Sequence, residues 1–422
     1  MKFMRIGICA LLAFGILAHG GVEDWARACF ETGAGLLFLA WAVQLYRNSE
    51  EVIVISPLLP PLASLLLLVL GQMAFSTTLS LYATHQEFML LLADTVVMFL
   101  AAQAFRTVED WRGFIWFAMI FGFLVAIFGI LQHLTFNGKL YWFREMHYGG
   151  IPFGPYVNRN HFAGFAELFI PAALVPLMLG KVRRERVLVV GLFAVVSIGS
   201  LFLAASRGGV ISFAVQVLVI VGWMAWRRTR TKQMLAGAAV LAAALLMVSW
   251  LGVKEITQRF STMKAMEVAS GKRASMRKDT FKIFLDHPWM GTGLGTLQTA
   301  FPPYETLYDG RVVNHSHNDY VEALSDTGIF GGLCCALFLG MLLFHSLRQL
   351  SGDKLPFTAV LNLSGLVACI GFLVHSFVDF NLHLPANALL FFLMATLATS
   401  TPNASKSGAG ESKRHRHHKG KP

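Results

Sequence analysis

The chain contains twelve separate apolar runs, and most come close to the roughly 20 residues that an α-helix needs to cross the hydrocarbon core of a bilayer. With 55% hydrophobic and only 14% charged residues, a water-soluble fold has no room to bury so much apolar surface. The sequence therefore predicts an all-α, polytopic integral membrane protein with about 12 transmembrane helices. The runs cover residues 6–19, 28–46, 53–74, 87–104, 113–134, 161–180, 187–205, 209–226, 234–251, 328–347, 357–378 and 384–399.

Two of these runs have unusual flanks. The first follows Lys2 and Arg5 and resembles the core of a signal peptide in length. No small-residue cleavage site with a polar segment after it is present, so we expect a retained helix. The third run contains Pro57, Pro60 and Pro61, which predicts a helix that starts late or is kinked.

All cysteines lie inside apolar runs, whereas a disulfide framework would lie in polar loops. We therefore expect small buried thiols that form neither disulfides nor a metal site. These residues are Cys9, Cys29, Cys334, Cys335 and Cys369.

Lysines and arginines in the short loops favour one side of the membrane, and the positive-inside rule then predicts that both termini are cytoplasmic. The net charge of +11 owes much to the tail ESKRHRHHKGKP. We expect the tail, residues 401–422, to be disordered and to contact anionic membrane lipids. No nucleic-acid partner and no chemistry are assigned to it.

The same pattern divides the chain into four parts. Residues 1–251 are expected to form helices 1–9, and residues 320–400 to form helices 10–12. Residues 252–319 form one long outer loop, too short for a sizeable core of its own. Within it, ASMRKDTFKIFLDHPW predicts an amphipathic helix that ends at the His287 and Pro288 pair.

That helix is predicted to lie on the membrane surface or to cover a cavity. Its apolar face would carry Ala274, Phe281, Phe284 and Leu285, and its polar face Lys278, Asp279 and Lys282. The glycines that follow, Gly291, Gly293 and Gly295, suggest a flexible turn or a plain connector.

The loop ends in the stretch NHSHNDYVEALSDTGIFG, residues 314–331. Ser316 and Asp319 have the spacing of a capping box, which would place His317 in the first turn of a new helix. A histidine at a water-accessible boundary is able to accept a proton. The alternative interpretation is that His315 and His317 are interfacial residues that finish the loop.

Three outer arginines, Arg159, Arg207 and Arg277, are candidates for binding phosphate, because guanidinium groups bind phosphate oxygens in a planar, two-pronged way. Arg207 lies in a tight turn where an unpaired charge would be costly. Arg159 is otherwise a snorkelling boundary residue, and Arg277 an ordinary solvated charge. His161 is expected to cap or pack the sixth helix, and Asp379 to mark the turn before the last one. Acidic residues look sparse on the outer face and none is clearly placed to bind a divalent metal, so no metal or other cofactor is expected.

These segments together resemble the O-antigen ligase family, which also contains O-antigen polymerases and protein O-oligosaccharyltransferases. The matching pieces are GPYVNRNHFAGF, SRGG, MRKDTFKIFLDHPWMGTGLGT and SHNDYVEALSDTGIFGG, in this order between about residues 150 and 345. The resemblance implies a GT-C-like membrane fold in the bacterial inner membrane. It also implies a periplasmic active site.

By this resemblance His317 corresponds to the essential histidine, and Arg207, Arg277 and Arg159 would bind the diphosphate of an undecaprenyl-diphosphate-linked glycan. Supporting roles are possible for His315, Asn318, Asp319 and His161. His317 would position or deprotonate an acceptor hydroxyl in a metal-independent displacement that inverts the anomeric carbon.

The acceptor is open at this point. A ligase transfers to the lipid A core, a polymerase to another lipid-linked repeat, and a protein glycosyltransferase to a Ser or Thr side chain. The chain shows no additional folded outer domain after its twelfth run, which favours the ligase. A transporter of small anions such as bicarbonate is the alternative from another class, although no paired broken helices indicate alternating access.

Overall fold

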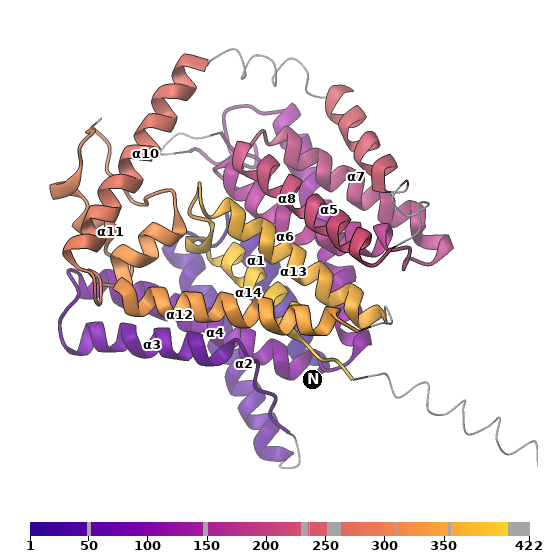
Figure 1. The fold of residues 1–422 in the computed structure, drawn as a ribbon, viewed down its shortest axis with the longest axis horizontal. Coiled ribbons are helices and arrows are strands. Elements are labelled where there is room, and N and C mark those ends of the chain that lie inside the picture. The colour runs from indigo at the N-terminus through magenta and orange to yellow at the C-terminus, as the bar shows by residue number, and fades with distance from the viewer. Residues whose placement is uncertain are drawn as a thin grey trace, which may run out of the picture.

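The computed structural model describes residues 1–48, 52–146, 151–228, 235, 237–250, 263–308, 310–352 and 356–403. These residues form α-helices joined by turns and short 3-10 helices (Figure 1). The elements are α1 Lys2–Leu17, α2 Asp24–Arg47, α3 Leu59–Ala74, α4 Leu81–Ala104, α5 Val108–Leu134, α6 Arg159–Met178, η1 Arg184–Arg186, α7 Val187–Leu203, α8 Arg207–Trp226, an unlabelled helix Gly237–Trp250, α10 Met263–Asp286, α11 Leu297–Ala300, η2 Pro302–Tyr304, α12 Asp319–Leu350, α13 Phe357–His375, η3 Asn381–His383 and α14 Pro385–Thr399.

Eight stretches of helix within the described part of the chain are long and apolar enough to cross a membrane. They are α2, α4, α5, α6, η1 with α7, α8, α12 and α13. Each of the twelve apolar runs overlaps a helix, and α3, Gly237–Trp250 and α14 are shorter apolar helices. The prediction of an all-α polytopic membrane protein is therefore confirmed. That all twelve helices cross the membrane stays a prediction.

In the third apolar run, residues 53–74, the helix begins several residues after the run itself, as predicted. Helix α3 starts at Leu59, with Pro60 and Pro61 in its first turn. Proline is tolerated there because the first backbone N–H groups of a helix have no intrahelical partner.

The centre of the bundle is built by α6, α13 and α14. Every residue of α14 is buried, and so is every residue of α6 from Phe162 to Met178. Helices α13 and α14 approach closely at Gly365, where a Cβ atom would lie 2.5 Å from the carbonyl oxygen of Met394. Small residues allow such close helix contacts where a bilayer offers no hydrophobic drive for association.

Both ends of the described chain lie at the same end of the bundle. Arg5 in α1 forms an ion pair with Asp110 at the start of α5. The backbone N–H of Asn403, after α14, donates to the carbonyl of Arg106 at 2.9 Å. At the other end of α1, the carbonyl of Gly20 accepts from the N–H of Ala386 at 3.0 Å. The predicted topology requires this arrangement, and the compartment that the two ends face stays a prediction.

Helix α12 is broken at Gly328, where φ is 62° and ψ is −162°. The loop after α10 binds the backbone groups that the break sets free. The N–H of Ile329 donates to the carbonyl of Pro288 at 2.7 Å, and the N–H of Thr292 donates to the carbonyl of Ser325 at 2.9 Å. Non-helical backbone is tolerated at membrane depth only where protein or water satisfies it.

Glycine is required in the segment 288–295 because neighbouring atoms leave no room for a side chain, so the predicted flexible turn is wrong. A Cβ atom at Gly291 would lie 2.3 Å from the backbone carbon of Asp326, and one at Gly328 would lie 2.3 Å from the carbonyl oxygen of Trp289. The side chain of Gln72 in α3 also donates to the carbonyls of Met290 and Asp326, at 2.6 and 2.9 Å. The glycine-rich segment is therefore fixed between α3 and the break in α12.

Helix α10 ends at Asp286, as the His287 and Pro288 pair predicted. Asp279, predicted on the polar face, is buried together with Ile283, whereas Phe281 and Leu285 of the predicted apolar face are 42% and 59% exposed. The Asp279 carboxylate accepts from the N–H and hydroxyl of Thr306 at 3.0 and 2.7 Å. A buried carboxylate thus attaches α10 to the segment after η2, and α10 lies beside α11 at one end of the bundle (Figure 1).

Candidate functional site

The start of α12 is attached to the end of α13. The N–H of Asp319 donates to the carbonyl of Ser376 at 3.0 Å. The side chain of Asn318 donates to the carbonyl of Phe377 at 2.9 Å, and the hydroxyl of Tyr320 donates to the carbonyl of Leu373 at 2.7 Å. These bonds bring residues 314–322 beside residues 375–383.

The predicted capping box is wrong, because Asn318 caps α12. Its side-chain oxygen accepts from the N–H groups of Tyr320 and Val321, both at 3.0 Å. Ser316 instead donates its hydroxyl to the carbonyl of Asn318 at 2.9 Å. The structure prefers Asn318 because its side chain lies immediately before the first free N–H groups of the helix.

His317 consequently precedes α12 instead of lying in its first turn. Its φ is 55°, in the left-handed region that residues other than glycine rarely adopt. Such strain persists only where surrounding contacts impose it, and it is concentrated at functional sites.

His317 belongs to the Asp379 group, which consists of Asp379, His317 and His161. Nδ1 of His317 lies 3.3 Å from Oδ1 of Asp379, and Nε2 of His161 lies 3.9 Å from the same oxygen. The Asp379 side chain is 1% exposed, whereas that of His317 is 22% exposed. Burial alone would raise the pKa of Asp379, but the hydrogen bond with His317 and the charges of nearby histidines hold it well below its ordinary value.

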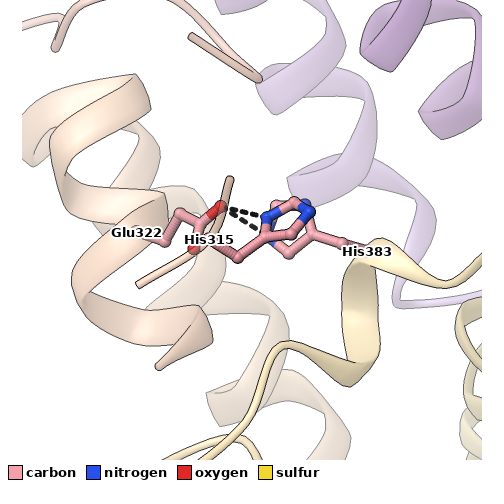
Figure 2. Close-up of side chains that lie close together, drawn as sticks. All are labelled: His315, Glu322 and His383. Carbon is pink, nitrogen blue, oxygen red and sulfur yellow. Dashed lines mark hydrogen bonds and ion pairs between the residues drawn. The ribbon is translucent and has the colours of Figure 1, made fainter. Parts of the chain in front are cut away.

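The Glu322 group consists of Glu322, His315 and His383 (Figure 2). Oε1 of Glu322 lies 2.7 Å from Nδ1 of His315 and 3.3 Å from Nε2 of His383. Burial alone would lower the pKa of His315, but the Glu322 carboxylate raises it above its ordinary value. From the sequence alone, no acidic pair on this face was expected to bind a divalent metal. Here a carboxylate and two imidazoles, the side chains that bind transition metals, have ligand atoms within 4.8 Å of one another.

Phe380 lies between the two groups. Its ring stacks on His315, with centroids 4.3 Å apart and an interplanar angle of 21°. It meets His317 and His161 edge to face, at 5.0 and 4.9 Å. One aromatic ring therefore fixes three imidazoles and keeps the two carboxylates apart. His161 contacts this ring and does not cap α6, whose cap is Asn158.

Two cavities adjoin the Glu322 group. A polar cavity of about 960 Å³ is lined by His315, Glu322 and His383 together with Arg27 and Glu87. An apolar cavity of about 380 Å³ between α3, α4, α12 and α14 shares Glu87 and His383 with it. A lipid-linked polar group needs this combination of an apolar and a polar compartment side by side.

Arg207 is the first residue of α8 and is exposed. Ser206 caps the helix by accepting from the N–H of Gly209 at 3.2 Å. A Cβ atom at Gly208 would lie 2.6 Å from the ring of His375, so the SRGG turn packs directly on the end of α13. His375 is itself buried, with Nδ1 2.9 Å from Oε1 of Glu167 in α6.

The other two candidate arginines lie on different elements. Arg159 is the first residue of α6, two positions before His161. Arg277 lies on α10, next to Met276, which packs against the hydrophobic cluster that includes Val313 just before the histidines. The helices that carry Arg159 and Arg207 thus begin beside residues 375–379, and Arg277 lies on a helix beside the segment that leads to His315.

Several site residues were missed or undervalued in the sequence. Asp379 was interpreted as a turn marker, and His375, His383, Glu322 and Phe380 were not singled out. The signal is the segment HSFVDFNLHLP, which has five polar residues at the junction of two apolar runs. The expectation of sparse acidic residues is wrong for this region. Three buried carboxylates, those of Asp319, Glu322 and Asp326, lie on α12, and the buried Asp379 follows α13. They lie inside or beside apolar runs, where loop-based counting overlooks them.

The comparison with protein families gives one match. Its description is O-antigen ligase, and it covers residues 192–336, from α7 to the middle of α12. The match includes Arg207, Arg277, His315, His317 and Glu322. No curated protein matches the chain.

Proposed function

We propose that this membrane protein, whose residues 192–336 match the O-antigen ligase family, is an O-antigen ligase. In this proposal it transfers a glycan from undecaprenyl diphosphate to the lipid A core at the periplasmic face of the bacterial inner membrane. The family match supports a glycosyltransferase of the O-antigen ligase or polymerase type. The identity of the donor, the identity of the acceptor and the location in the bacterial inner membrane are part of the proposal.

The observation that carries the proposal is the contact between His317 and Asp379. Asp379 faces Nδ1 of His317 at 3.3 Å, which leaves Nε2 as the nitrogen available to a substrate. A buried, ionised carboxylate orients the imidazole and stabilises the positive charge that forms when the ring takes a proton. The strained backbone at His317 is the kind of feature that a structure maintains for function.

The reaction is a single displacement. The acceptor hydroxyl transfers its proton to Nε2 of His317 while its oxygen bonds to the anomeric carbon. The bond from that carbon to the phosphate oxygen breaks, the configuration inverts, and undecaprenyl diphosphate leaves. Help from a general base is typically worth about 10² to 10⁴ in rate. No metal ion takes part in these bond changes.

Arg207, Arg277 and Arg159 are proposed to bind the diphosphate and to offset the charge that develops as the bond breaks. Arg207 supports this role because it is exposed at the start of α8, where the helix dipole also favours an anion. The apolar cavity of about 380 Å³ suits the polyprenyl chain next to the bond. Asn318, which caps α12, positions His317, and Asp319 binds the turn before α14 through the N–H of Leu382 at 3.3 Å.

The test removes the gene from its native host and restores it as the wild type or as His317→Ala. Surface lipopolysaccharide and lipid-linked glycan are then compared by gel electrophoresis and mass spectrometry. A ligase predicts cores without polymer and an accumulation of long lipid-linked chains, both corrected only by the wild-type copy. Cores that bear a single repeat would indicate a polymerase, and unchanged glycans with altered glycoproteins would indicate transfer to protein.

A further inference from the structure

We propose that the Glu322 group, His315, Glu322 and His383, binds a divalent transition-metal ion, with Zn²⁺ as the best match to its side chains. Two imidazoles and one carboxylate form a typical zinc ligand set, whereas Ca²⁺ and Mg²⁺ prefer oxygen ligands alone. The inference concerns the binding of an ion and holds whether or not the protein is a ligase.

The ligand atoms already converge. Oε1 of Glu322 lies 2.7 Å from Nδ1 of His315 and 3.3 Å from Nε2 of His383, and one ligand atom from each residue lies within 4.8 Å of the others. Zinc bonds of about 2.0 to 2.2 Å in a tetrahedral arrangement hold two ligand atoms about 3.3 Å apart. Only small side-chain shifts separate the observed arrangement from that spacing.

The surrounding contacts orient each ligand. Oε2 of Glu322 accepts from the N–H of Ser316 at 2.8 Å and from its hydroxyl at 3.1 Å, which leaves Oε1 to face the two rings (Figure 2). The His315 ring is held between Phe380 at 4.3 Å and His383 at 4.5 Å. Groups that orient a ligand in this way strengthen metal sites.

The buried charge also favours a dication. Glu322 and Asp319 lie one helical turn apart and are only 1% and 5% exposed. Oδ1 of Asp319 is buried without a hydrogen-bond partner among the described residues, and it faces Nε2 of His383 at 3.7 Å. Buried carboxylates are costly unless a positive charge offsets them, and a bound ion would offset both.

The ion would also have an open side. The three residues line the polar cavity of about 960 Å³, so an ion with three protein ligands keeps a position for water or another oxygen ligand. It would connect the segment before α12, α12 itself and η3, and thereby fix the loop that carries His317. We therefore expect the ion to stabilise the folded protein.

The experiment uses the full chain, purified without a polyhistidine tag. The tail histidines His415, His417 and His418 are replaced by alanine to form the background protein, so that any ion bound by the tail is not counted. After treatment with EDTA, the protein is titrated with Zn²⁺ and with Co²⁺. Metal content after gel filtration, the Zn²⁺ Kd from competition with a chelating dye, the visible spectrum of Co²⁺ and the melting temperature are measured.

The background protein is expected to retain about one Zn²⁺ per chain, to give visible Co²⁺ bands and to melt at a higher temperature with Zn²⁺. His383→Gln and Glu322→Gln should each weaken binding by more than about 100-fold, since even the loss of a group that only orients a ligand costs about 10- to 100-fold. His287→Gln, at an exposed histidine outside the group, is the matched control and should bind like the background.

The proposal is overturned if the background protein retains no Zn²⁺, which would mean that the tail held whatever ion the natural chain binds. It is equally overturned if His383→Gln binds as tightly as His287→Gln. Glu322→Gln is judged only if it elutes and melts as a folded protein, because Glu322 also binds Ser316. His383→Gln makes no such backbone contact and decides the question alone if Glu322→Gln fails to fold.

Discussion

The Asp379 group and the Glu322 group both contact the ring of Phe380, and each joins two histidines to a buried carboxylate. In the Asp379 group the ring nitrogens lie 3.3 and 3.9 Å from the oxygen, and the backbone of His317 is left-handed. In the Glu322 group the distances are 2.7 and 3.3 Å, and the residues line the polar cavity. Similar side chains thus occur in a looser and a tighter arrangement.

The difference suggests a division of labour. A general base needs one oriented nitrogen and one free nitrogen, and the contact of Nδ1 of His317 with Asp379 leaves Nε2 free. A metal site needs ligand atoms that converge on one point, which the Glu322 group provides. The predictions below test this division, beginning with the largest expected effect.

The largest effect is expected for His317→Ala. Transfer of glycan by purified protein should fall by about 10² to 10⁴, because the proposed base is lost. The rate is measured with a lipid-linked donor and an isolated core acceptor. His315→Ala, on the other side of Phe380, is the matched comparison. A greater loss in His315→Ala than in His317→Ala would move the base to the Glu322 group.

Asp379→Asn should reduce the transfer rate by about 10- to 100-fold, the equivalent of losing a charged hydrogen bond of about 1.5 to 3 kcal/mol. The asparagine has nearly the same shape but cannot stabilise a protonated imidazole by charge. The measurement is kcat with saturating acceptor. Wild-type kcat in this variant would mean that Asp379 serves the fold and not the reaction.

Asp379 also predicts a pH effect on stability. Its pKa is lowered in the folded protein, so its contribution is present above the unfolded value of about 4 and is lost as the pH falls through the folded pKa. The melting temperature of the wild type should therefore fall more steeply below about pH 4 than that of Asp379→Asn. Parallel curves for the two proteins would contradict the ionised, paired state of Asp379.

Arg207→Lys should reduce kcat/KM by about tenfold, because lysine keeps the charge but loses the planar, two-pronged contact with phosphate. Arg207 is exposed at the start of α8, so the folded state should change little. Arg184→Lys, in η1 between α6 and α7, is the control. Equal rates in the two variants would remove Arg207 from the diphosphate site.

The smallest effect on transfer is expected for Asp279→Ala on α10, which belongs to neither group. The carboxylate accepts three hydrogen bonds from Thr306 and Lys282, so its loss should destabilise the attachment of α10 by about 1 to 3 kcal/mol. Faster limited proteolysis between α10 and α12 is the measurement. A transfer defect as large as that of His317→Ala would show that the attachment of α10 is needed to hold Arg277 at the donor.

The membrane fold could be predicted from the sequence because each membrane-spanning helix is specified by a short, continuous stretch of residues. A run of about 20 apolar side chains specifies a membrane-spanning helix wherever its neighbours lie. The same local logic places the start of α3 after Pro57 and the end of α10 before His287. It fails for the faces of α10, because the partner of Asp279 is Thr306, which lies 27 residues later.

The candidate site could be predicted only in part. The histidines of NHSHND and Arg207 of SRGG are visible as polar residues at membrane boundaries, and the family resemblance that they support agrees with the family match. The turn HSFVDFNLHLP looked like a connector, and the glycines after α10 looked flexible. Their partners, His317 and the break in α12, lie far away in the sequence.

The amino-acid sequence by itself therefore determined a polytopic helical protein, its helix positions and the histidines and arginines at the ends of its helices. The tertiary structure decided which carboxylate faces which histidine, because Asp379 and His317 are 62 residues apart and meet only when α12, α13 and α14 pack together. Hydropathy follows from each residue alone, whereas hydrogen-bonded groups depend on backbone contacts such as that between Asp319 and Ser376.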